Sequence, residues 1–191
     1  MLVWNFVGHA AVLNGNGSNG LSAVMWAPGA AGDSVLPALP NPQQFADAPQ
    51  AVLFACNHNA IRSPMAAGIL RHLAGKRIYV RSAGVRPGEI DPFAVAAMDE
   101  IGIDISRHQP RSFEDLEETS FDLIVTLAPE AHHKALNLAR GIAIDVEYWP
   151  TMDPSAYGGN REQILQAYRA VRDQLFERVK ARFGFTAAPQ A

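Results

Sequence analysis

Cys56 is the only cysteine of the chain, and it ends the short apolar run Ala51–Cys56, six residues before Arg62. A strand, a tight loop and a helix N-terminus are expected in this order, with Ser63 and Pro64 opening the helix. Backbone N–H groups in such a loop bind anions, and the helix dipole adds to the positive potential. Thiols ionise readily in such loops, since a pKa near ~8.5 falls to roughly 3.5–7.5 beside helix N-termini and cations. These residues predict a thiolate nucleophile below a receptor for a tetrahedral oxyanion.

Composition narrows the classes of function that the chain can have. It has 191 residues, 48% of them hydrophobic, and a net charge of −3, which favours one domain and gives no reason to expect nucleic-acid binding. No apolar run approaches the ~20 residues of a membrane span, and residues 1–50 contain no Lys or Arg for a secretory signal. One cysteine excludes an internal disulfide, a cysteine-cluster metal site and a C-x-x-C relay. We expect a reduced, cytoplasmic setting.

The pattern along the chain predicts an α/β domain after an N-terminal extension. Residues 1–49 are rich in Gly, Asn, Ala and Pro and predict a poorly ordered tail, with the domain over 50–191. From there strands alternate with helices, which predicts a parallel sheet with right-handed crossovers. Ligands bind at the carboxyl ends of such strands, where the Cys56 loop is expected. The expected strands are 51–55, 77–82, 121–127 and 142–148, and the expected helices begin at Ser63, Asp91, Ser112, Pro129 and Asn160.

The segment from Cys56 to Ser63 resembles the phosphate-binding loop of low-molecular-weight protein tyrosine phosphatases, and that of the thiol-linked arsenate reductases built on the same fold. Ser82-Ala83-Gly84 after the second strand and Asp153-Pro154 after the fourth agree with both groups. The resemblance covers about 51–183. It implies an α/β three-layer sandwich of flavodoxin-like type, with a four-stranded parallel sheet in the order 2-1-3-4.

The resemblance also implies a role for each residue of the site. Cys56 is the expected nucleophile, Arg62 grips two oxyanion oxygens, and Asp153 is the general acid and then the base. Asn59 tolerates the left-handed backbone of the loop, Ser63 supports the thiolate, and no metal or other cofactor is expected. The remaining candidates are the phosphate-binding amides of Asn57, His58, Asn59, Ala60, Ile61 and Arg62, and Tyr157 at the substrate rim, with Tyr148 and Trp149 as alternative aromatic contacts.

Plainer interpretations exist for the same residues. A lone cysteine is often a small buried hydrophobe, and Asp before Pro often opens a turn. Ser63 can be an ordinary helix cap, with Pro64 at the first helical position. His58 is either an exposed loop residue or a contact to the substrate. The Cys56 nucleophile depends on the combination of loop, arginine and Asp-Pro rather than on any one residue.

Two enzymatic functions and one binding function fit these motifs. We expect a phosphatase that hydrolyses phosphate monoesters, phosphotyrosine on proteins first, through a cysteinyl-phosphate. The alternative is an arsenate reductase that uses an external thiol such as glutathione or mycothiol, because a single cysteine leaves no internal disulfide relay. The short segment 85–92 lacks an aromatic residue, and 91–106 looks closer to arsenate reductases and bacterial phosphatases. A phosphate- or phosphoprotein-binding module without turnover is the third possibility.

Overall fold

The computed structural model describes residues 49–116 and 120–185. The N-terminal extension expected over 1–49 therefore lies outside the described residues, apart from Pro49.

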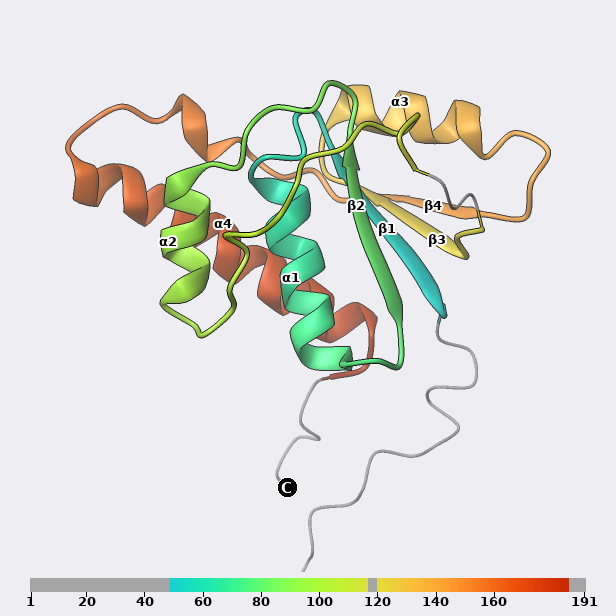
Figure 1. Cartoon of the computed structure of the whole chain (residues 1–191), viewed down its shortest axis with the longest axis horizontal. Helices are drawn as coiled ribbons and strands as arrows, with labels where there is room; N and C mark the ends of the chain where they lie inside the picture. Colours follow the sequence, from blue (N-terminus) through green and yellow to red (C-terminus); the bar gives the residue numbers. More distant parts are fainter. Residues whose placement is uncertain (1–48, 117–119, 186–191) are drawn as a thin grey trace, which may run out of the picture. The chain divides into compact units, whose positions relative to one another are not determined.

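Four parallel strands form one sheet in the order β2-β1-β3-β4, which confirms the predicted topology (Figure 1). All three pairs of neighbouring strands run parallel, so the chain returns to the same edge of the sheet through a crossover connection before each new strand. In the register of β1 and β2, Cys56 pairs with Gly84 at the carboxyl edge of the sheet. The bounds are β1 Ala51–Cys56, β2 Tyr79–Gly84, β3 Leu123–Thr126 and β4 Asp145–Tyr148.

Helices cover both faces of the sheet and make three layers. Successive side chains of β1 point to opposite faces, as a strand requires. Val52 and Phe54 face the core below α1 (Arg62–Ala74) and α4 (Arg161–Arg182), with α2 (Pro92–Asp99) packed on α4. Leu53 and Ala55 face a smaller core below α3 (Pro129–Leu138). None of the helices among the described residues combines the length and apolar character needed to cross a bilayer.

Two of the predicted helix starts are capped by side chains. The Asp91 carboxylate accepts hydrogen bonds from the backbone of Phe93 and Ala94 at the start of α2. Asn160 and Gln163 form a reciprocal capping box at the start of α4. Each arrangement satisfies N–H groups that the first helical turn leaves without partners.

Two local predictions are wrong. Ser63 does not cap α1, because its hydroxyl forms a hydrogen bond with the Cys56 sulfur inside the loop. The helix begins one residue earlier, at Arg62, and Ile61 in the N-cap position offers no side-chain hydrogen bond. No helix forms over 113–116, where a turn lies. The turn forms because the Asp115 carboxylate accepts hydrogen bonds from the amide and the hydroxyl of Ser112. The backbone of Ser112 also forms an isolated β-bridge with Gly84 beside the sheet.

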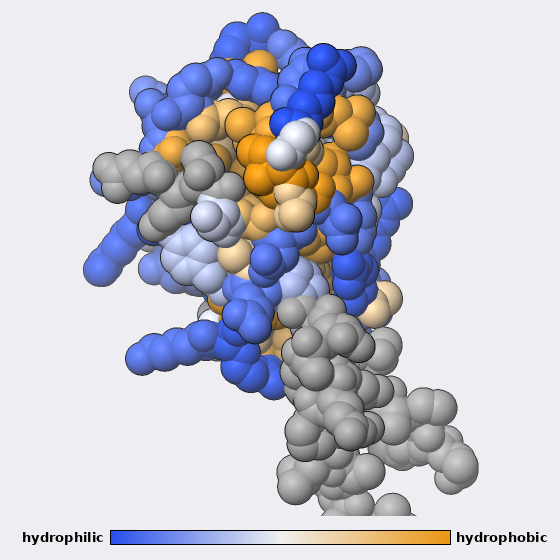
Figure 2. All heavy atoms as spheres, turned by 90° about the vertical axis from the view of Figure 1, so that its right-hand side faces the viewer, coloured by the Kyte–Doolittle hydropathy of each residue, from blue (hydrophilic) through white to orange (hydrophobic). Residues whose placement is uncertain are grey.

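Apolar side chains reach the surface on the side of the molecule that carries α3 and β4. Figure 2 shows them gathered in the middle of this face among polar residues. Leu136, Leu138 and Ile142 are the large exposed hydrophobic residues of α3 and of the turn that leads to β4.

Candidate active site

The Cys56 loop lies at the carboxyl end of the central strand β1, as predicted. The thiol is buried, and its sulfur lies 3.0 Å from the Ser63 hydroxyl oxygen. The Asn59 amide also donates to the sulfur, at 3.3 Å, and the Asn59 side-chain nitrogen donates to the Ser63 oxygen at 2.9 Å. The sulfur therefore has one backbone donor and one hydroxyl partner, at the N-terminus of α1, where the helix dipole is positive. These surroundings suit the nucleophilic role predicted for Cys56.

Asn59 holds the loop in its unusual shape. Its φ of 52° lies in the left-handed region, which confirms the expected backbone conformation. The fully buried side chain also accepts a hydrogen bond from the Arg111 amide at 2.9 Å and lies 3.0 Å from His108 Nε2. Since the Asn59 backbone oxygen is the other partner of Nε2, at 3.2 Å, both partners are acceptors and Nε2 carries the hydrogen.

His108 is a residue that sequence reasoning missed. It lies 49 positions from Asn59 in the chain, and no local spacing signals the contact. Burial is the main cause that lowers the pKa of His108, and the positive charges of Arg71 and Arg111 lower it further. The neutral imidazole therefore supports the loop at neutral pH.

Gly84 gives the loop its room. A side-chain carbon at position 84 would lie 2.8 Å from the Asn59 amide nitrogen and 2.9 Å from the His58 carbonyl carbon. Both are backbone atoms, which cannot rotate away as a flexible side chain could. The Ser-Ala-Gly motif thus has a steric reason: only glycine lets β2 pass this close below the Cys56 loop.

Arg62 and Asp153 meet above the loop, although 91 positions separate them in the chain. The buried Arg62 guanidinium donates through Nη2 to Asp153 Oδ2 at 2.6 Å and through Nη1 to the Thr151 carbonyl at 3.0 Å. Its Nε is buried and has no hydrogen-bond partner in the part of the chain that the structure describes. The other carboxylate oxygen of Asp153 accepts from the amide and the hydroxyl of Ser155. Asp153 is therefore both a turn former and a partner of the predicted oxyanion-binding arginine.

A cavity of about 260 Å³ opens over these groups. Several donors are available at its floor, because the amides of His58, Ala60, Ile61 and Arg62 donate to no acceptor among the described residues. Convergent backbone amides of this kind bind anions. The cavity is lined by Cys56, Arg62 and Asp153, and also by His58, Glu89, Asp91 and Ser155.

The other predicted residues differ in whether they line this cavity. Ala60 and Ile61 line it, whereas Asn57 and Asn59 lie behind it and shape the loop. The Nδ1 atom of His58 lies 3.2 Å from the Arg86 carbonyl oxygen. Tyr157 is exposed and donates to the sulfur of Met152, and it is not among the lining residues. Its rim position stays a prediction.

Asp91 is a second residue that the sequence did not single out for the site. Besides capping α2 it accepts a hydrogen bond from the Tyr168 hydroxyl at 3.0 Å, and burial together with this bond raises the pKa of Tyr168. The pair ties the cavity wall to α4. Among residues 49–116 and 120–185, no group of three or more His, Cys, Asp or Glu side chains is placed to hold a metal ion.

Comparison with known proteins places this geometry in a family. The model described as low molecular weight phosphotyrosine protein phosphatase matches residues 51–184. A glutaredoxin arsenate reductase of Synechocystis is 32% identical over 131 residues, which are 68% of this chain and 92% of the relative. An arsenate reductase of Bacillus subtilis is 33% identical over 129 residues, 68% of this chain and 91% of the relative.

Solved structures of both enzyme types superpose on the chain. An arsenate reductase described in a phosphate-binding state is 30% identical with a TM-score of 0.60, over 71% of this chain and 98% of its own. A low molecular weight protein tyrosine phosphatase from T. tengcongensis is 27% identical with a TM-score of 0.60, over 72% of this chain and 99% of its own. The fold is shared by both, so it does not separate the two activities.

Proposed function

Because the chain belongs to the low molecular weight phosphotyrosine protein phosphatase family, we propose that it is a cysteine-dependent phosphatase that hydrolyses phosphate monoesters, with phosphotyrosine on proteins as the first substrate class. The supporting observation is that Asp153 lies 2.6 Å from Arg62 above the loop of the only cysteine. Hydrolysis needs a nucleophile, a cation for the oxyanion and a proton donor, and it needs no further thiol.

The reaction follows from the groups around the cavity. The Cys56 thiolate attacks phosphorus and forms an S–P bond while the bond from phosphorus to the leaving oxygen breaks. Phosphoryl oxygens take the place of Asp153 at Arg62 and accept from the unpaired amides of the loop. Asp153, released from the guanidinium, takes up a proton from solvent and passes it to the leaving oxygen. It then takes a proton from the water that attacks the cysteinyl-phosphate and frees inorganic phosphate.

Ser63 and Asn59 act on the sulfur in both steps. The Asn59 side chain donates to the Ser63 hydroxyl, which is thereby oriented to donate its own hydrogen to Cys56. A thiolate held by such donors is a better leaving group when the cysteinyl-phosphate is hydrolysed. These two are positioning residues.

Arsenate reduction is the second candidate, and on likeness to named relatives it has the stronger support. Cys56 would displace a hydroxyl group of arsenate and form an S–As bond. An external thiol would then attack the Cys56 sulfur, giving a mixed disulfide and arsenite, and a second thiol would release Cys56 and leave the external disulfide. Two thiols thus supply the two electrons that reduce arsenic. The chain itself has no second cysteine for this purpose.

A paired assay on one preparation tests the two candidates. We expect hydrolysis of p-nitrophenyl phosphate, and a loss of about 10⁴-fold or more in Cys56→Ser, as for removal of other catalytic nucleophiles. In parallel, arsenite is measured with arsenate and either glutathione or mycothiol. Turnover in the second assay alone would overturn the phosphatase and favour the reductase. Hydrolysis by Cys56→Ser at the wild-type rate would contradict the cysteinyl-phosphate mechanism.

Asp153→Asn separates proton donation from binding. p-Nitrophenoxide leaves without a proton, whereas phenoxide does not, so the variant should slow phenyl phosphate far more than p-nitrophenyl phosphate. The amide keeps the shape of the side chain and the contacts to Ser155. Equal slowing of both substrates would assign Asp153 to binding or to the turn.

A further inference from the structure

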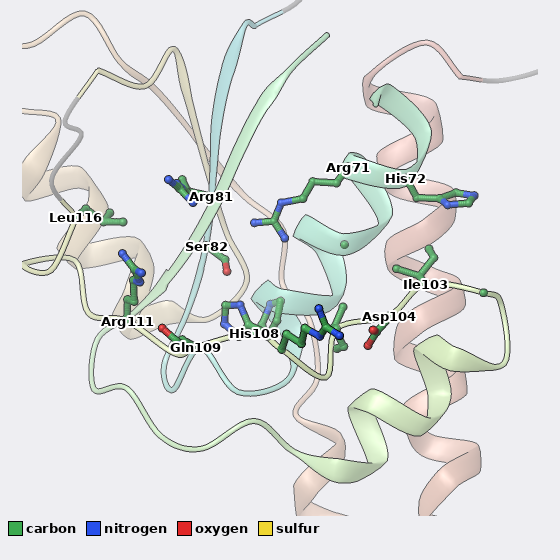
Figure 3. Close-up of a pocket in the computed structure, with 15 residues that line it drawn as sticks. Arg71, His72, Arg81, Ser82, Ile103, Asp104, His108, Gln109, Arg111 and Leu116 are labelled. Carbon is green, nitrogen blue, oxygen red and sulfur yellow. The ribbon is translucent and has the colours of Figure 1, made fainter. Parts of the chain in front are cut away.

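A second, larger cavity lies on the other side of the Cys56 loop. It measures about 580 Å³ and opens between α1 and the segment 102–111. Figure 3 shows the side chains that surround it. The catalytic cavity shares none of its lining residues, so the two are separate spaces.

Positive charge is concentrated around this second cavity. Among the described residues, four arginines line it, Arg71, Arg81, Arg107 and Arg111, against one carboxylate, Asp104. The chain as a whole carries a net charge of −3, so the concentration is local. Arg71 is fixed by two bonds from its guanidinium to the Val80 carbonyl. Like charges gathered around one cavity repel one another, and an anion between them would relieve the repulsion.

Ser82 supplies an independent indication of a ligand. Its hydroxyl is buried, borders this cavity and has no hydrogen-bond partner within residues 49–116 and 120–185. An unpaired buried hydroxyl is costly, which makes it unusual in a stable fold. Figure 3 shows Ser82 between Arg71 and His108. The reaction at Cys56 makes no use of this hydroxyl, whereas an oxyanion in the cavity would accept its hydrogen.

The cavity is also connected to the catalytic loop. His108 borders the cavity, and its Nε2 donates to Asn59, the residue that positions Ser63 and the sulfur. Arg111 borders it too, and the Arg111 amide donates to the same Asn59 oxygen. A change in the charge or position of either residue therefore reaches the Cys56 loop through Asn59.

We propose that this second cavity binds a small organic diphosphate, and that occupancy is transmitted to the Cys56 loop through His108 and Asn59. The volume exceeds what one phosphate group fills, and Ile103 and Ile105 give the cavity an apolar wall beside its guanidinium groups. Bidentate guanidinium donors suit phosphate oxygens. The site is distinct from the substrate position above Cys56, and it does not depend on which of the two reactions the enzyme performs.

Calorimetric titration with methylenediphosphonate, a non-hydrolysable diphosphate, tests the proposal. The full chain is first treated with iodoacetamide, which can block only Cys56 because there is no second cysteine, and intact mass verifies one adduct. We expect one binding event that persists after blocking. Arg107→Ala combined with Arg111→Ala should weaken it at least about tenfold, since two guanidinium contacts are lost. Ser82→Ala, nearly isosteric, should also weaken it.

Arg140→Ala is the matched control, because Arg140 is exposed and lies after α3, away from the cavity. It should bind the probe like the wild type. Far-UV circular dichroism verifies that each variant is folded. Equal affinity in all variants, no binding, or binding that blocking of Cys56 abolishes would overturn the site.

The link to the loop is read by ¹H–¹⁵N NMR. The Asn59 amide should shift on addition of the probe in the wild type and in Arg140→Ala, and stay unchanged in the arginine double variant. Binding without a shift at Asn59 would overturn the transmission. Hydrolysis of p-nitrophenyl phosphate without probe is measured separately, so that failure of the catalytic assignment is distinguished from failure of this site.

Discussion

At the scale of single residues, Asn59 connects the parts of the site. Its backbone donates to Cys56, its side-chain nitrogen donates to Ser63, and its side-chain oxygen accepts from Arg111 and His108. The left-handed backbone could be expected from the sequence, because asparagine tolerates this conformation. The partners could not, since His108 and Arg111 come from a segment about fifty positions away whose approach depends on the whole fold.

Two substitutions of Asn59 separate its backbone from its side chain. Asn59→Gly and Asn59→Ala lose the same side-chain hydrogen bonds, and we expect both to slow turnover. Only alanine is strained at a φ of 52°, so Asn59→Ala should be less stable than Asn59→Gly by about 1 kcal/mol. Urea unfolding measures the difference. Equal stability would mean that the loop changes its backbone in the variants.

At the scale of elements, the approach of β2 to the Cys56 loop sets the geometry of the site. The alternation of strands and helices predicted the parallel sheet and placed the loop at its carboxyl edge. Element ends were harder to predict, because tertiary contacts determine them. The position of Ser63 before Pro64 predicted a helix cap, but its hydroxyl forms a hydrogen bond with the Cys56 sulfur instead. The short helix predicted over 113–116 is replaced by a turn that the Asp115 carboxylate closes.

Gly84→Ala tests this approach. A methyl group there meets loop backbone at 2.8 and 2.9 Å, so we expect the loop to shift and kcat to fall at least about tenfold. Gly88→Ala is the matched control, because its nearest contacts, at 3.6 Å and beyond, are ordinary van der Waals distances to the same loop. Steady-state kinetics of both variants provide the measurement. Equal activity in the two would show that the loop accommodates the methyl group without consequence.

At the scale of the whole molecule, the contacts between helices hold the cavity wall in place. Glu100, just after α2, binds Arg169 and Arg172 of α4. The hydrogen bond from Arg169, with Arg172 contributing, lowers the pKa of Glu100 from 4.5 to about 2. The unfolded chain therefore binds a proton at higher pH than the folded one, so this stabilisation is complete at neutral pH and is lost as the pH falls from about 4.5 toward 2.

Glu100→Gln should accordingly lower the thermal midpoint near neutral pH, and the difference from the wild type should shrink at pH about 3. The effect is small, because a third of the Glu100 side chain is exposed to solvent. Glu177→Gln, which removes an exposed pair within α4, is the control that should show less change. A difference independent of pH would contradict the ion-pair explanation.

The domain boundary is a further prediction at this scale. Every side chain that lines the cavity over Cys56 lies between Cys56 and Ser155, within the matched family region. We propose that the domain starts near residue 50, and that a chain lacking residues 1–49 keeps kcat and KM for p-nitrophenyl phosphate. Kinetics of the truncated and full chains measure this, and a large loss would show that the extension contributes to catalysis.

The proposed mechanism depends on a covalent bond between the Cys56 sulfur and the phosphorus of the substrate. Acid quenching during p-nitrophenyl phosphate turnover, followed by mass spectrometry of the peptide that contains Cys56, looks for that bond directly. We predict a phosphoryl group on Cys56 during turnover and none in Arg62→Ala, in which the oxyanion is no longer held. Turnover with an unmodified Cys56, or with the phosphoryl group on another side chain, would contradict the account.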